Sequence, residues 1–122
     1  MENIADGKLL RIFIGENDSY DGRPLYEAIV LMLRSEGLAG ATVFRGIEGF
    51  GASSRIHTAK ALRLSEDLPI LIECVDRAEN IEKVLSILDD MVTEGLVTIE
   101  KAEIRIYRGR TKAGVTAEYS GR

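Results

Sequence analysis

The sequence contains few of the residues on which disulfides, metal centres and catalytic triads depend. Its 122 residues include one cysteine, Cys74, one histidine, His57, two prolines and no tryptophan. A single cysteine excludes an internal disulfide and any zinc site built from several thiolates. Cys74 lies in an apolar run, where we expect a small buried hydrophobic side chain. His57 stands in a polar loop, and we expect it to be solvated or to order that loop.

Long apolar runs and a surplus of basic residues are also missing. No stretch approaches the ~20 apolar residues of a membrane span. Residues 1–6 also lack the basic region and the apolar core that are typical of a signal peptide. The cytoplasm is therefore the expected location. The net charge of −4 disfavours nucleic acid as a partner, because duplex binders usually carry a basic face. The length fits a single domain over residues 1–122.

Hydrophobic periodicity predicts two β-α-β halves joined by a polar loop. Strands are expected at residues 8–15, 41–47 and 67–75, with a last extended segment at 96–99 and 102–108. One helix is expected to have Pro24 in its first turn and to end at Gly37, and the other to run from an N-cap at Asp76 to Gly95. Residues 16–23 and 52–66 are expected as polar loops, the second flexible over 52–64 with a short helical piece around 58–62. The tail 111–122 is expected to be loose.

Two such halves pack as an α+β, ferredoxin-like βαββαβ sandwich with both helices on one face of the sheet. The first strand is apolar at nearly every position from Leu9 to Ile14, which indicates burial on both faces. Two helices cannot cover both faces. We therefore expect a second subunit to cover the other face, in an oligomer built through the sheets.

The glycine-rich stretch 40–51, which ends in Gly49-Phe50-Gly51, is the strongest indication of a ligand site. Glycine lets a backbone approach a partner closely, and free N–H groups can form an anion-binding nest. A bulge or tight turn without a ligand is the alternative interpretation. Arg45, within this stretch, can pair with Glu73 or Glu16 or point at a ligand.

Charged residues elsewhere give weaker indications. Arg105 and Arg108 are three residues apart, so they point to opposite faces of a regular strand. Either can hold a phosphate, and a solvated or ion-paired edge is the alternative. The acidic residues around the first loop do not have the spacing of a calcium loop and are expected to form a polar turn; they are Glu16, Asp18, Asp21 and Glu27. No nucleophile–base–acid set is evident, so an enzyme is not expected.

Several segments resemble the PII signalling proteins. Gly40-Ala-Thr-Val, followed by Gly49-Phe-Gly51, is similar to the second-strand signature of those proteins, and Leu68-Pro-Ile-Leu-Ile-Glu-Cys-Val-Asp76 is similar to their third strand. The closer resemblance is to the PII-like family called domain of unknown function 190. It is carried by Ile12-Phe-Ile-Gly-Glu16, Gly22-Arg-Pro-Leu-Tyr-Glu-Ala-Ile29 and the long glycine segment, and it covers residues 8 to about 108.

This resemblance implies a homotrimeric regulatory protein with a nucleotide cleft between neighbouring subunits. It also implies a mobile loop between the second and third strands that contacts a partner protein, such as a membrane transporter or channel. The ligand-binding residues that it implies, together with the residue patterns above, are Arg45, Gly49, Phe50, Gly51, Glu73, Val75, Arg105 and Arg108.

The chain departs from the PII pattern in ways that bear on the ligand. Residues 94–101 stand where PII proteins carry a glycine-rich phosphate loop, and Ala52 and Ser53 replace basic and amide residues. Tyr107 follows two residues after Arg105, the match to the last-strand arginine. These departures disfavour a triphosphate and leave AMP or ADP as the expected ligand, with no obligatory cofactor. The alternative is an enzyme or divalent-metal-binding protein on the same trimeric fold, using His57 and the acidic loop residues.

Overall fold

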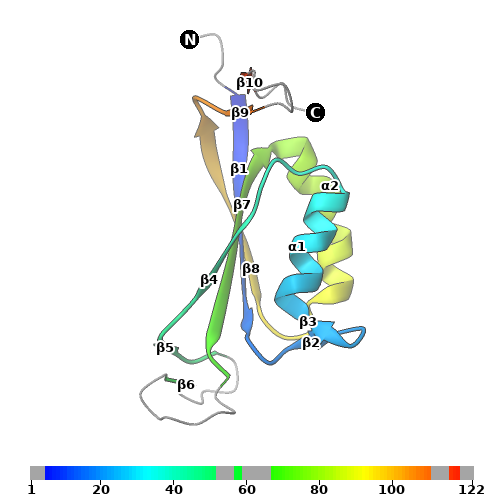
Figure 1. The fold of residues 1–122 in the computed structure, drawn as a ribbon, viewed down its shortest axis with the longest axis vertical. Helices are drawn as coiled ribbons and strands as arrows, with labels where there is room; N and C mark the ends of the chain where they lie inside the picture. Colours follow the sequence, from blue (N-terminus) through cyan, green and yellow to red (C-terminus); the bar gives the residue numbers. More distant parts are fainter. Residues whose placement is uncertain (1–4, 52–56, 59–66, 111–115, 119–122) are drawn as a thin grey trace.

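A computed structural model describes residues 5–51, 57–58, 67–110 and 116–118 (Figure 1). Most of the expected loop 52–64 and most of the tail 111–122 lie outside these residues. Thr58, which was expected at the start of a helical piece, instead belongs to a short strand. Within the described residues, neither helix is long and apolar enough to cross a membrane.

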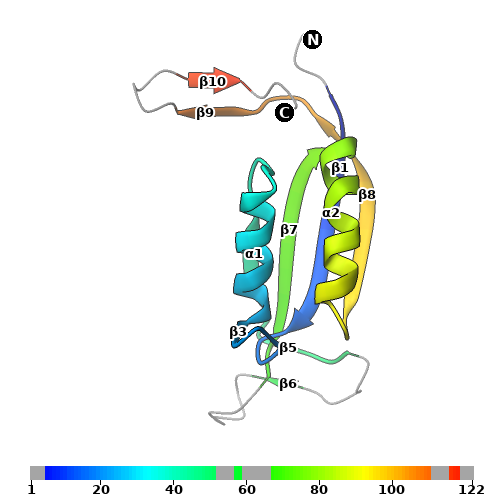
Figure 2. The same cartoon turned by 90° about the vertical axis from the view of Figure 1, so that its right-hand side faces the viewer.

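A four-stranded antiparallel sheet forms the centre of the molecule. In spatial order its strands are β4 (Thr42–Arg45), β7 (Pro69–Arg77), β1 (Ala5–Gly15) and β8 (Leu96–Ile104). The helices α1 (Leu25–Ser35) and α2 (Ala78–Met91) lie side by side on one face of this sheet (Figures 1 and 2). This arrangement is the predicted ferredoxin-like sandwich.

The core lies between the sheet and the two helices. Side chains on β1 and β7 alternate between the two faces, and those toward the helices are buried. The helices contribute apolar stripes of helical period, as the sequence predicted. The buried apolar residues are Leu10, Ile12, Ile14, Ile70, Ile72 and Cys74 from the strands, Leu25, Ala28, Ile29, Leu33, Ile81, Val84, Leu88 and Met91 from the helices, and Leu38 from the connection after α1.

The opposite face of the sheet, which we call the open face, carries both apolar and charged side chains. Phe13 on β1 is 38% exposed and Val75 on β7 is 44% exposed. Between them, Arg11 Nε donates to Glu73 Oε2 at 3.0 Å, and Arg11 Nη1 donates to Glu100 Oε2 at 3.3 Å. The apolar face expected from the first strand is therefore present, with an ion-paired row across it.

Several local predictions around the helices are corrected by the structure. Residues 16–23 are not simply a loop: β2 (Ser19–Tyr20) pairs with β3 (Arg23–Pro24) across Asp21 and Gly22, which both have positive φ. Pro24 precedes α1 rather than starting it. Gly37 follows α1 with a φ of +86°, as predicted for a helix C-terminus.

The second helix differs from its prediction at both ends. Its N-cap residue is Arg77, because the carboxylate of Asp76 binds Arg77 N and two other donors instead of capping the helix. The helix ends at Met91, before Gly95. Gly95 has a φ of +153° and lies against the strand β1, where an added Cβ would be 2.6 Å from the Phe13 carbonyl oxygen.

Two strands also end earlier than predicted. The strand expected at 41–47 covers only Thr42–Arg45, and it is exposed at every position because β4 is an edge strand. The last strand, β8, stops at Ile104, which pairs with Ala5, the first residue of β1 that the structure describes. The chain then turns away from the sheet into β9 (Arg108–Arg110), which pairs with β10 (Thr116–Glu118) (Figure 2). Part of the tail expected to be loose is therefore a strand.

Candidate functional site

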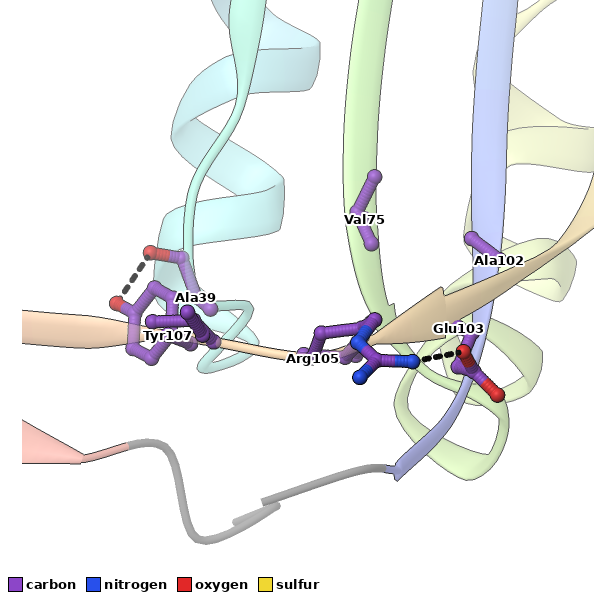
Figure 3. Close-up of a pocket in the computed structure, with 8 residues that line it drawn as sticks. Ala39, Val75, Ala102, Glu103, Arg105 and Tyr107 are labelled. Carbon is purple, nitrogen blue, oxygen red and sulfur yellow. Dashed lines mark hydrogen bonds and ion pairs between the residues drawn. The ribbon is translucent and has the colours of Figure 1, made fainter. Parts of the chain in front are cut away.

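A groove of about 360 Å³ lies where β8 ends and the chain turns toward β9 (Figure 3). Val75 and Ala102 contribute an apolar surface from the ends of two strands, and Tyr107 and Ala39 form one wall. A charged pair, Glu103 and Arg105, stands at the other side. The full lining is Ala39, Val75, Ala102, Glu103, Ile104, Arg105, Ile106 and Tyr107.

The two charged residues of the groove contact each other. Arg105 Nη1 donates to Glu103 Oε1 at 3.2 Å, and both side chains are more than half exposed. An exposed ion pair of this kind is weak, so Arg105 can exchange Glu103 for another anion at little cost. A guanidinium beside an apolar surface is suited to a ligand with one anionic and one apolar part.

The wall of the groove is fixed by hydrogen bonds to the backbone N–H and C=O of one residue, Ala39. Tyr107 Oη donates to the carbonyl oxygen of Ala39 at 3.3 Å, as Figure 3 shows. Ala39 N in turn donates to Asp76 Oδ2 at 2.7 Å. Ala39 follows α1 and Tyr107 follows β8, so the wall joins segments that are far apart in the sequence.

The glycine-rich stretch runs along β4 from the groove, and its last part, residues 46–51, lies at the other end of the sheet, with Gly46 and Gly49 beside Pro69. An added Cβ on Gly46 would be 2.8 Å from Pro69 Cγ, and one on Gly49 would be 3.2 Å from the same atom. These two glycines therefore serve close packing of the chain, and β5 (Glu48–Gly49) pairs with β6 (His57–Thr58) there. Among the residues that the structure describes, none lies within 4 Å of where a Gly51 Cβ would be, and Phe50 is 70% exposed.

Arg45 and Glu73 both have protein partners in the structure. Arg45 Nη2 lies 2.6 Å from Glu16 Oε2, which is the second of the three partners expected for it. Glu73 accepts from Arg11 in the middle of the open face. In this chain neither side chain lies in the groove.

The eight residues predicted for the ligand site are thus divided between separate places. Arg45, Gly49, Phe50 and Gly51 lie at the Pro69 end of the sheet, and Glu73 lies at its centre. Val75 and Arg105 line the groove, and Arg108 begins the adjoining strand β9. Pro69 and Val75 are six residues apart on β7, or ~20 Å at a rise of ~3.3 Å per residue. A small ligand cannot contact both ends of the sheet within one chain.

Comparison with known proteins establishes the family. The profile of domain of unknown function 190, described as an uncharacterized ACR, matches residues 7–104. A UPF0166 protein of Methanocaldococcus jannaschii is 39% identical over 109 residues, which are 88% of this chain and 98% of the relative. A UPF0166 protein of Aquifex aeolicus is 38% identical over 101 residues, 83% of this chain and 95% of the relative. The chain belongs to the domain of unknown function 190 family.

Solved structures of PII-like proteins share the fold of this family member. CPII of Thiomonas intermedia K12, described as a nitrogen regulatory PII-like protein bound to ADP, AMP and bicarbonate, superposes with a TM-score of 0.62 at 17% identity. The match covers 83% of this chain and 90% of CPII. CPII bound to ADP and bicarbonate gives a TM-score of 0.58 at 16% identity over the same shares. The PII-like resemblance predicted from the sequence is confirmed.

The structure gives no catalytic or metal-binding role to the other reactive or acidic residues that it describes. Cys74 is buried under the helices, and burial raises the pKa of its thiol to about 12, so it is a poor nucleophile. Asp18 Oδ2 accepts from Gly15 N at 3.0 Å and orders the turn after β1. Among the described residues, no three His, Cys, Asp or Glu side chains lie together as metal ligands. The side chain of His57 lies outside the described part of the chain.

Sequence reasoning noted Tyr107 only as a departure from the PII pattern, and it missed five other groove residues: Ala39, Ala102, Glu103, Ile104 and Ile106. Alanines carry no chemical signal, and their place in the groove depends on which strands are neighbours. Tyr107 offered a signal, because an aromatic ring can stack on the flat ring of a ligand.

Proposed function

We propose that the protein is a PII-like regulator that binds AMP or ADP in clefts between the subunits of a homotrimer. The observation that carries this proposal is the groove, in which an exposed arginine stands beside an apolar surface and a tyrosine ring. The fold is shared with CPII, which has been solved with ADP and AMP.

The groove matches the two halves of a nucleotide. Val75, Ala102 and the ring of Tyr107 offer an apolar surface for the base. Arg105 supplies the charge for a phosphate once it releases Glu103. Arg108 begins β9 directly beyond the groove and can add a second cation.

The predicted site residues are divided between the two ends of the sheet, and this supports a ligand cleft formed between two copies of the chain. Gly49-Phe50-Gly51 and Arg105 are too far apart to meet one small ligand within a chain. A second copy against the open face can bring its groove to the Gly51 end of the first. The exposed Phe13 and Val75 on that face favour such contact, because burying apolar surface stabilises association.

The turn before β8 supports a ligand with fewer than three phosphates. It contains one glycine, Gly95, and that residue lies against the Phe13 carbonyl rather than facing an open space. The backbone there offers no glycine-rich cradle for a further phosphate. We therefore favour AMP or ADP over ATP.

Residues 52–64 follow Gly51 directly, and we assign them the contact with a partner protein, such as a membrane transporter or channel. A ligand beside Gly51 changes the environment of the first residues of this segment. Ordering of a segment by a ligand is a common regulatory device.

A thermal-shift panel tests the proposal against its alternative. AMP and ADP should raise the melting temperature of the protein without magnesium. The Arg105→Gln variant should lose this shift, whereas Arg34→Gln, at an exposed position in α1's last turn that does not line the groove, should keep it. Stabilisation by divalent metals alone, with no response to nucleotides, would instead favour a metal-binding protein or enzyme.

A further inference from the structure

One residue in the wall of the groove, Ala39, is held through both of its backbone polar groups. The Ala39 N–H donates to Asp76 Oδ2 at 2.7 Å, and the Ala39 carbonyl accepts from Tyr107 Oη at 3.3 Å. Ala39 belongs to the connection between α1 and β4, whereas Asp76 lies near the end of β7. The wall therefore depends on a carboxylate that is not itself among the residues lining the groove.

The orientation of the Asp76 carboxylate is fixed by its burial and by its other hydrogen bonds. Its side chain is 1% exposed. Its other oxygen, Oδ1, accepts from Arg77 N at 2.7 Å and from Asn80 Nδ2 at 2.8 Å, both at the start of α2. Asn80 is also buried, at 5% exposure. A buried carboxylate with three such donors cannot rotate without losing a hydrogen bond to a charged group, which is costly.

We propose that Asp76 is a positioning residue for the groove, an inference that rests on the proposed nucleotide-binding function. It holds the Ala39 backbone through its N–H, so that the carbonyl of the same residue meets Tyr107 and the tyrosine ring faces the ligand. The wall is then ordered before the ligand binds, so less conformational entropy is lost on binding. The same carboxylate joins the first turn of α2 to the groove.

The Asp76→Ala variant of the full chain tests this inference, because alanine removes both acceptor oxygens. We expect AMP affinity, measured by calorimetry, to fall by about tenfold, equivalent to about 1.4 kcal/mol. In ¹⁵N–¹H NMR spectra, the Ala39 amide should exchange with solvent at least about tenfold faster than in the wild type, since it loses a hydrogen bond of the charged class. Leu25→Ala is the matched control, because it removes a buried side chain at the opposite end of α1. That control should keep both AMP affinity and Ala39 protection.

A second variant covers the case in which Asp76→Ala does not fold. Tyr107 is partly exposed, so Tyr107→Phe should fold normally while losing the bond to the Ala39 carbonyl. It should lower AMP affinity severalfold and leave Ala39 N–H protected by Asp76.

Three results separate the inference from the proposed function. Wild-type AMP affinity in Asp76→Ala, or in Tyr107→Phe if only that variant folds, would overturn the positioning role. Unchanged Ala39 exchange in Asp76→Ala would overturn it as well. A wild-type protein that binds no nucleotide would instead contradict the proposed function. The exchange rate of the Ala39 amide in Asp76→Ala would still decide whether Asp76 holds the wall.

Discussion

Arg45 Nη2 lies 2.6 Å from Glu16 Oε2, and this ion pair joins the middle of the glycine-rich stretch, at the end of β4, to the residue that follows β1. After residues 52–66, the chain returns to the same place: Asn17 N donates to Asp67 Oδ1 at 2.7 Å, and Glu16 N donates to the Leu68 carbonyl at 2.8 Å. Both ends of the segment between β4 and β7 are thus attached to the turn that follows β1. This geometry gives Arg45 a role in holding that segment.

The glycines of this stretch should differ in what they contribute. Gly46→Ala should destabilise the fold by about 1–3 kcal/mol, the usual cost of overpacking, because its Cβ would be 2.8 Å from Pro69 Cγ. Gly51→Ala should leave stability unchanged, since no described residue lies within 4 Å of its Cβ, but should weaken AMP binding if the ligand occupies that position. Denaturant unfolding and calorimetry on both variants give the comparison. Equal AMP affinity for Gly51→Ala and the wild type would remove Gly51 from the site.

The open face of the sheet should be a contact between subunits. Light scattering at low micromolar concentration should give about three chains per particle for the wild type. Phe13→Glu should yield monomers, because it places a charge within the apolar part of that face. Leu31→Glu is the control, since Leu31 is similarly exposed, at 42%, but lies on α1 on the other side of the sheet. A wild-type protein that stays monomeric at high concentration would contradict the trimer.

Glu103 and Arg105 should have opposite effects on nucleotide affinity. Arg105→Gln should weaken AMP binding by about 1.5–3 kcal/mol, the scale of a hydrogen bond to a charged group. Glu103→Gln should strengthen it by about 0.2–1 kcal/mol, because the phosphate no longer competes with an exposed ion pair. Calorimetric titrations of the two variants measure both effects. Weaker binding by Glu103→Gln would show that the glutamate itself contacts the ligand.

The buried thiol should make stability depend on alkaline pH. The pKa of Cys74 is about 12 in the folded protein, above the ordinary value near 9. Between these values the unfolded chain releases a proton that the folded chain retains, so stability falls as pH rises above 9. The loss is at most about 1.4 kcal/mol for each pH unit. Urea unfolding of wild type and Cys74→Ala at pH 8 to 11 should show the wild type losing stability relative to the variant, and a constant difference would contradict this.

The fold could be predicted because its signals are local. The spacing of Leu25, Ile29 and Leu33 follows one face of a helix, and Gly37 ends that helix with a positive φ. The end of the last strand could not be predicted in this way. Residues 102–108 have continuous strand character, and β8 nevertheless stops at Ile104, whose pairing partner Ala5 lies about a hundred residues earlier in the chain.

The candidate site could be predicted only in part, for similar reasons. Val75 and Arg105 were identified from the resemblance and do line the groove, whereas Ala39 reaches it only through the strand order and its bond to Asp76. Glycine patterns cannot separate close packing from ligand approach, because both require a missing Cβ. Gly46 and Gly49 serve packing against Pro69, whereas no described residue lies within 4 Å of a Gly51 Cβ.

Isothermal titration of the wild-type protein with AMP, ADP and ATP, in the absence of magnesium, tests the central claim most directly. The groove beside Arg105, and a turn before β8 that offers no phosphate cradle, predict that AMP and ADP bind at least as tightly as ATP. The absence of heat with all three nucleotides at millimolar concentration would contradict nucleotide binding. A clear preference for ATP would contradict the assignment of the ligand.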